Sequence, residues 1–258
     1  MKRLATLAAL LAVCATPSFA TVLLSESFTY PNGALPPNGG WANFSGAGTE
    51  IQVASGRAVI DHNSAPDDHI LFPAQSTTTK TYACFDVIVP PVVGGQPKPV
   101  YFAMLKDGGT SIFVSRVYVV GLAAGGMTFA ISHSSTTATA GITPWTAPIV
   151  AGQKYNIVIN YDPVAKSSTM WVNPANELSA SVTDVNAAIA AVAVQGFGLR
   201  ESSTAATLPA SPAYPGAINI QVSVDNLGVG TTFADACQQY QSTPATRSTW
   251  GQVKSIYR

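Results

Sequence analysis

The side chains best suited to chemistry gather in one short stretch of the sequence. Residues 61–63 are Asp-His-Asn and residues 67–69 are Asp-Asp-His, with Ser-Ala-Pro between the two groups. Carboxylate and amide oxygens suit calcium, and the two histidines would suit zinc or a lyase-type base. A solvated loop that joins two strands is the alternative, because such loops are also polar. The candidate ligand-binding residues here are Asp61, His62, Asp67, Asp68 and His69.

The remaining acidic residues do not form the pattern of a glycoside hydrolase. Such an enzyme needs two carboxyl groups about 5 to 9.5 Å apart across the scissile bond. No Glu-x-Asp-x-x-Glu string is present, and most of the acids are isolated or lie in turns. Motifs for a serine nucleophile elbow, a zinc protease and a phosphate loop are also absent from the sequence. We therefore assign no catalytic residues, although acids from distant strands could still converge in a groove.

Tryptophan side chains form a second group of candidates, because flat aromatic faces stack on the apolar faces of sugar rings. Trp145 lies in a proline-flanked segment, Thr-Pro-Trp-Thr, and we expect it to be exposed. Trp41 and Trp171 stand beside strand-like segments and are expected in the core. Trp145 is thus the predicted aromatic contact for a ligand.

The first twenty residues have the pattern of a secretory signal peptide. Lys2 and Arg3 precede an apolar run that ends in Ser18-Phe19-Ala20, a small-x-small cleavage site. Cleavage after Ala20 removes two of the 13 basic residues and none of the 13 acidic ones. The near-neutral remainder does not favour nucleic acid or acidic membranes as partners. We expect a secreted protein, extracellular or associated with the cell surface, with no transmembrane segment after cleavage.

Short β-rich segments separated by Gly, Pro, Asn and Ser clusters dominate the rest of the chain. Residues 155–161 alternate between two faces, which is typical of a strand with one buried side. About ten such strands favour a single two-sheet sandwich over residues 21–237. The predicted strands are 21–30, 50–61, 80–89, 100–105, 112–122, 127–132, 154–161, 168–172, 194–200 and 218–229.

Helical patterns occur in two places only. Residues 184–193 are Ala-rich, and either a surface helix or an irregular crossover fits them. Residues 238–248 resemble a polar linker, and residues 249–258 form a short amphipathic segment with a Thr-x-x-Gln capping box. This C-terminal segment is either a sorting, anchoring or partner-binding element, or a helix that folds back on its own domain.

Two cysteines, Cys84 and Cys237, remain once the signal peptide is removed. In an exported protein such a pair can form a disulfide, which would tie the end of the last strand to the sheet. One buried thiol and one free thiol is the alternative, because sequence separation does not fix the distance between the two Cβ atoms.

Three motifs together resemble those of secreted bacterial concanavalin A-like (LamG-like) jelly-roll proteins. They are Glu26-Ser-Phe-Thr-Tyr-Pro-Asn-Gly-Ala-Leu35 with Gly40-Trp41, Met170-Trp-Val-Asn-Pro174, and Val224-Asp-Asn-Leu-Gly-Val-Gly-Thr-Thr-Phe233. The motifs span nearly all of the predicted domain. The resemblance implies an all-β, two-sheet antiparallel jelly-roll sandwich. By analogy it also implies carbohydrate binding, surface adhesion or, in some branches, glycoside hydrolysis or polysaccharide lysis.

A second metal hypothesis depends on this fold. The first and last strands of such jelly rolls often lie side by side, which would place Glu26 near Asp225 and allow a structural calcium. Alternatively, Asp225 and Asn226 shape a turn or accept a backbone donor.

The function that the sequence favours is a secreted, non-catalytic module that binds a glycan or a cell-surface or matrix component, with calcium as a candidate cofactor. A structural, self-associating extracellular protein is the main alternative, because charge is low and Ser, Thr and Ala are abundant. An atypical glycoside hydrolase or polysaccharide lyase is the third.

Overall fold

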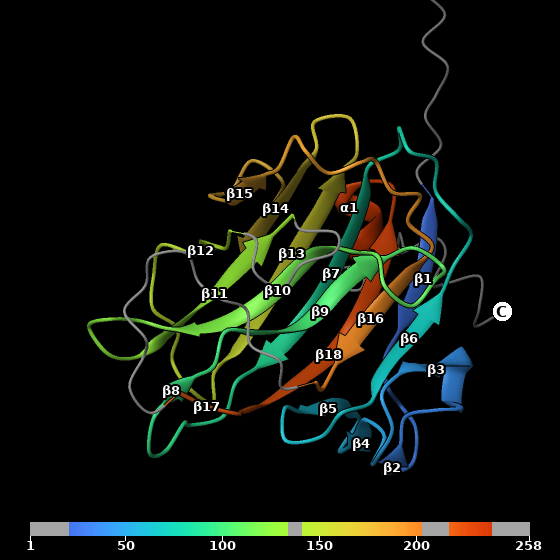
Figure 1. The fold of residues 1–258 in the computed structure, drawn as a ribbon. Coiled ribbons are helices and arrows are strands. Elements are labelled where there is room, and N and C mark those ends of the chain that lie inside the picture. Colours follow the sequence, from blue (N-terminus) through green and yellow to red (C-terminus); the bar gives the residue numbers. More distant parts are fainter. Residues whose placement is uncertain (1–20, 134–140, 203–216, 239–258) are drawn as a thin grey trace, which may run out of the picture.

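The computed structural model describes residues 21–133, 141–202 and 217–238. The signal peptide predicted at residues 1–20, most of the predicted linker and the whole amphipathic segment lie outside the described residues. Within the described ranges, no helix is long and apolar enough to cross a membrane. Two large sheets face each other across the core (Figure 1).

Nine strands form the larger sheet, in the order β15-β14-β13-β7-β18-β5-β4-β2, with β1 also paired to β18. All of these pairs are antiparallel. The strands are β1 (Val22–Glu26), β2 (Gly33–Ala34), β4 (Gln52–Ala54), β5 (Arg57–Asp61), β7 (Thr81–Ile88), β13 (Lys154–Asp162), β14 (Ser167–Val172), β15 (Val182–Val185) and β18 (Gln221–Gly230).

Seven strands form the second sheet, in the order β12-β11-β10-β9-β16-β6-β3, again with antiparallel pairing. They are β3 (Ala42–Ser45), β6 (Asp67–Leu71), β9 (Val100–Lys106), β10 (Phe113–Gly121), β11 (Met127–Ser132), β12 (Thr143–Pro144) and β16 (Gly196–Arg200). A small parallel pair, β8 (Gln96–Pro97) and β17 (Ala217–Ile218), lies apart from both sheets. The structure confirms the predicted antiparallel jelly-roll sandwich.

The helical elements of the described residues are short. These residues contain a 3-10 turn, η1 (Asn38–Gly40), and one short helix, α1 (Phe233–Ala236). Residues 182–185, where the sequence suggested the start of a helix or crossover, form β15 and pair with β14. This edge pairing satisfies the backbone of residues 182–185, and the Ala-rich run after them is irregular, so of the two alternatives for residues 184–193 the structure has the irregular crossover.

The main core lies between the two sheets and contains the largest buried side chains. Along β7, Ala83, Phe85 and Val87 point into it, because alternate strand residues face opposite sides. Trp41 is 2% exposed and belongs to this core, as predicted.

A second apolar cluster covers the opposite face of the nine-stranded sheet. It joins Tyr82, Cys84, Val158 and Trp171 to Ala236 and Cys237, and Phe233 of α1 packs against it. Trp171 is therefore buried, but outside the main core. This cluster exists because α1 folds back over the sheet after β18.

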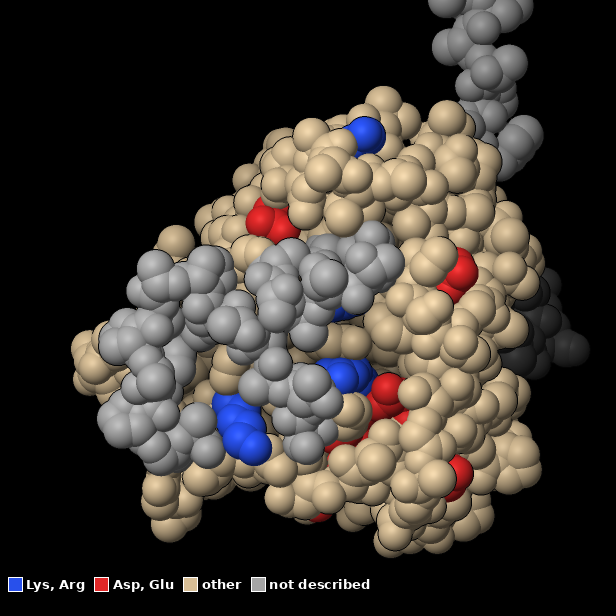
Figure 2. Space-filling view, in the orientation of Figure 1, with Lys and Arg blue, Asp and Glu red and all other residues tan. Residues whose placement is uncertain are grey.

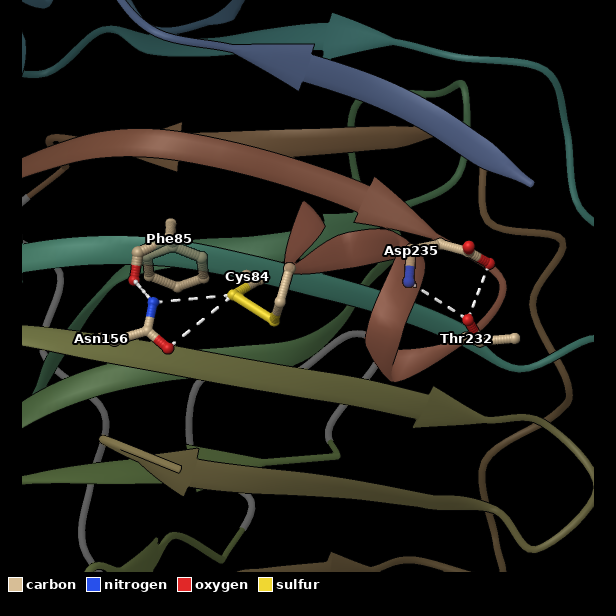
Figure 3. The surroundings of a disulfide bond; sticks show 6 residues. Cys84, Phe85, Asn156, Thr232 and Asp235 are labelled. Carbon is tan, nitrogen blue, oxygen red and sulfur yellow. Dashed lines mark hydrogen bonds between the residues drawn. A yellow bond between two sulfur atoms is a disulfide. The ribbon is translucent and has the colours of Figure 1, made fainter. Parts of the chain in front are cut away.

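A disulfide between Cys84 and Cys237 fixes α1 in this position (Figure 3). The two half-cystines are 153 residues apart in sequence. Asn156 Nδ2 donates to Cys84 Sγ at 3.6 Å, and Thr232 caps α1 by accepting from the backbone N–H of Asp235. Of the two alternatives for these cysteines, the structure has the disulfide.

Candidate functional site

The polar cluster predicted as one loop is divided by a strand. Residues 67–71 form β6, which pairs with β16 and β3, so successive side chains point to opposite faces of the sheet. Asp67 and His69 contact residues on the outer face, where Arg200 and Phe44 lie. Asp68, which stands between these two residues in the sequence, is fully buried. The alternative of a solvated loop therefore fits only part of the turn between β5 and β6, where Asn63 and Ala65 are exposed.

Aromatic and basic side chains line the outer face of the seven-stranded sheet, where Tyr101, Arg116 and Arg200 are 4%, 2% and 8% exposed. We call this group of residues the cationic–aromatic face. Its aromatic members form a cluster separate from the main core. Their rings pack edge to face or tilted, with centroids 5.6 to 6.3 Å apart. The face comprises Phe44, Asp67, His69, Tyr101, Met104, Lys106, Phe113, Arg116, Tyr118 and Arg200.

Two guanidinium groups lie over one tyrosine ring on this face. The Cζ atom of Arg200 is 4.2 Å from the ring centroid of Tyr101, and that of Arg116 is 4.8 Å from it. Asp67 is the acidic group beside them, with its carboxylate 3.8 Å from Arg200 Nε. The contacts are attractive because the ring face is electron-rich. Contact with the Tyr101 ring thus holds both guanidinium groups in place.

A β-bulge at Ser115 determines which side chains of β10 face outward. Ser115 has a positive φ of 49°, and the pairing with β9 shifts register there. Its hydroxyl points inward, donates to Asn160 O at 3.0 Å and lies 2.7 Å from Ser168 Oγ. Val114 faces the core, so strict alternation would turn Arg116 and Tyr118 inward as well. The extra residue at the bulge turns both of them to the outer face instead.

Lysine 106 and His69 form the other end of the face. Lys106 Nζ lies 3.0 Å from His69 Nδ1, donates to Asp107 O at 2.9 Å and lies 4.7 Å from the Phe44 centroid. Burial, followed by the charge of Lys106, lowers the pKa of His69 to about 4. His69 is therefore neutral at neutral pH, and its Nδ1 accepts from the ammonium. A Cβ at Gly198 would lie 2.6 Å from Met104 Cε, so the end of the Met104 side chain would have to shift to accommodate any other residue.

The other predicted ligands lie elsewhere. Asp61 lines a separate pocket beside the sandwich edge, where it accepts from Asn63 and Gln221. His62 is 1% exposed, and burial lowers its pKa to about 4, so it is a neutral interior residue. Trp145 follows β12, is half-buried and packs against the main core, so it is less exposed than expected.

The first and last strands do lie side by side, since Glu26 of β1 pairs with Leu227 of β18. Glu26, however, already has three donors: the Phe28 N–H at 2.6 Å, the Tyr30 hydroxyl at 2.6 Å and Trp41 Nε1 at 3.0 Å. Both of its oxygens are used by these bonds.

Asp225, the other member of the predicted metal pair, is also bonded within the protein. It makes a 3.1 Å ion pair with Arg57 and accepts from the Asn226 N–H. The described part of the chain contains no group of three or more His, Cys, Asp or Glu that could hold a metal ion. The donor geometry therefore gives no support to calcium at Glu26 and Asp225.

The three donors around Glu26 lead to a stability prediction. We expect Glu26→Gln to lower the free energy of unfolding by about 2 kcal/mol, because the amide NH₂ faces a donor whichever way it turns. Urea denaturation measures the change, with Glu177→Gln, an exposed residue, as the control. Equal stability of the two variants would show that the bonds to Glu26 contribute nothing.

No family model matches this chain, and no curated protein matches it. Among solved structures, it is similar to the CBM2 module of the evolved Dit protein of Lactobacillus casei BL23 phage J-1. The identity is 12%, the match covers 82% of this chain and 95% of that one, and the TM-score is 0.53.

Two plant lectins also match, at lower TM-scores. Peanut lectin with a 9-mer peptide is 14% identical over 80% of this chain and 97% of its own, with a TM-score of 0.47. The Lotus tetragonolobus seed lectin is 12% identical with the same coverage and a TM-score of 0.48. At such identities, the likeness to the CBM2 module supports the jelly-roll fold alone.

Proposed function

We propose that this protein is a secreted, non-catalytic module that binds an extracellular glycan on the cationic–aromatic face. The observation that carries the proposal is the ring of Tyr101 with Arg116 and Arg200 against it. Sugars are bound by aromatic rings together with a few placed hydrogen-bond donors, and guanidinium groups supply several donors in a fixed geometry.

The charges on this side of the molecule agree with this proposal. Figure 2 shows Lys and Arg atoms on the side where β9 and β16 lie in Figure 1, with acidic atoms beside them. The name of the matched CBM2 module is that of a carbohydrate-binding module, which favours the same class of ligand. A shared fold alone does not assign function, so the argument depends on the face itself.

A glycan array with the purified protein tests the proposal. We expect binding to at least one glycan, and Arg116→Gln and Arg200→Gln should each weaken it by roughly tenfold, the effect of one lost charge-assisted hydrogen bond. Trp145→Phe keeps the packing of that side chain and should bind normally. Parallel measurements with calcium and with a chelator test the candidate cofactor.

Three results would contradict the proposal. Binding to no glycan, with self-association seen by size-exclusion chromatography, would favour the structural alternative. Cleavage of a bound glycan would make the protein an atypical hydrolase or lyase. Binding that both arginine variants retain unchanged would place the site away from the cationic–aromatic face.

A further inference from the structure

A pocket separate from the cationic–aromatic face lies at the edge of the sandwich, where β4 begins and β5 ends, near Glu201, the residue that follows β16. Its volume is about 330 Å³, at the lower end of the range for small-molecule sites. Carboxyl, amide and hydroxyl groups dominate its wall, and none of the described residues that line it is basic. They are Thr49, Glu50, Gln52, Val59, Asp61, Asn63, Ser64, Glu201 and Gln221. We call this cavity the acidic pocket.

Buried acceptors without donors distinguish the acidic pocket from an ordinary acidic surface. Glu201 is 2% exposed; its Oε1 accepts from the Asp61 N–H at 3.0 Å, but its Oε2 has no hydrogen-bond partner among the described residues. Asp68 is fully buried near Glu50 and Glu201, and burial together with a hydrogen bond to Glu50 raises its pKa to about 8. Buried acceptors that lack a donor are costly, so a ligand that brings donors would be stabilised here.

The charge around these carboxyl groups is also unbalanced. Burial raises the pKa of Glu201 to about 7 and that of Asp68 to about 8, and the charges of neighbouring acids add to the effect. The nearby basic groups face other acids, since Arg57 pairs with Asp225 and Arg200 lies against Asp67. A positive charge brought by a ligand would therefore meet attraction from several sides.

The arrangement favours an organic cation over a metal ion. The described chain contains no group of three or more His, Cys, Asp or Glu that could hold a metal ion. The amide groups of Asn63 and Gln221 line the same cavity and donate to Asp61, and the second N–H of each amide suits a hydroxyl group. We propose that the acidic pocket binds an amino sugar through its protonated amine, which would lie between Glu50 and Glu201.

This inference rests on the proposed function, because it assumes that the protein binds sugars. It adds a second site and names a class of sugar, one that carries a positive charge. Isothermal titration of the purified protein at about pH 7, where much of the amine is protonated and about half of Glu201 is ionised, compares glucosamine, N-acetylglucosamine and glucose. We expect glucosamine to bind at least about tenfold more tightly than either neutral sugar, since only it offers an ammonium donor.

Variants of the pocket localise the effect. Glu201→Gln and Glu50→Gln remove one charge each while keeping side-chain size, and both should abolish most of the preference for glucosamine. Glu177→Gln removes a charge from an exposed position outside the pocket and should leave the preference intact. Thermal melting verifies that each variant is folded.

Equal affinity for the three sugars, or a preference that survives in both pocket variants, would overturn the inference. If lysinamide binds as tightly as glucosamine, the pocket recognises an amine without the sugar. That result would overturn the assignment of the ligand to the amino sugars. The failure of the proposed function is separable, because a glycan that binds through Arg116 and Arg200 without any glucosamine preference leaves that function standing.

Discussion

Replacement of both Cys84 and Cys237 by alanine should lower the free energy of unfolding by about 3 to 5 kcal/mol. The disulfide closes a loop of 153 residues, and the entropy that such a cross-link removes from the unfolded chain grows with loop length. Loss of the bond also frees α1 from the outer face of the nine-stranded sheet, where Trp171 and Phe233 pack. Chemical denaturation of the oxidised protein and of the double variant gives the difference.

A matched control separates the cross-link from the packing of the two side chains. Wild-type protein treated with reductant should become as unstable as the double alanine variant, whereas reductant should leave the variant unchanged. Because Cys84 is fully buried, its thiol would add only slightly to the stability of the reduced protein. A double variant as stable as the oxidised wild type would contradict the stabilising role of the bond.

The fold could be predicted from the sequence because its signals are local. Alternating apolar residues mark β7, β13 and β18, and Gly or Pro clusters mark the turns between them. The predicted segment 50–61 proved to be two strands, since Ser55 and Gly56 adopt positive φ and form a tight turn. The choice between a helix and an irregular crossover after residue 184 stayed open, because a single sequence does not show that an edge strand is available as a partner.

The candidate site was predicted only in part. Asp67 and His69 belong to the cationic–aromatic face, but their neighbour Asp68 lies on the opposite side of β6. The polar side chains of residues 61–69 favour a loop, so the sequence alone does not reveal the strand that begins at Asp67.

The arginines of the face could not have been found from spacing alone. Arg116 reaches the outer face because of the bulge at Ser115, and Arg200 joins it through pairing between β16 and β9. Both depend on long-range register. The aromatic prediction named Trp145 because its proline-flanked segment favours exposure, whereas the ring that contacts both arginines in the structure is that of Tyr101.

The stability of this protein should fall as pH rises from 6.5 to about 8, and Asp68→Asn should reduce that fall. Burial raises the pKa of Asp68 from 3.8 to about 8, so the folded state holds a proton that the unfolded state has lost. The stabilisation is complete below the unfolded pKa and is lost as pH rises through the folded one. At about pH 8 the variant should be more stable than wild type by roughly 2 kcal/mol, because it buries no charge.

The pH window is chosen so that histidines do not interfere. His62 and His69 have pKa values lowered from 6.5 to about 4, so they reduce stability only as pH falls below 6.5. Glu201, with its pKa raised to about 7, contributes the part of the slope that should remain in Asp68→Asn.

A second aspartate provides the control for this measurement. Hydrogen bonds and the Lys80 ion pair outweigh burial and lower the pKa of Asp162, so its protonation does not change between pH 6.5 and 8. Asp162→Asn should therefore keep the wild-type slope, even if it lowers stability throughout. Urea midpoints across the window measure both variants. An unchanged slope in Asp68→Asn would mean that Asp68 is ionised in the folded protein, and that a positive charge reaches the acidic pocket from the protein itself.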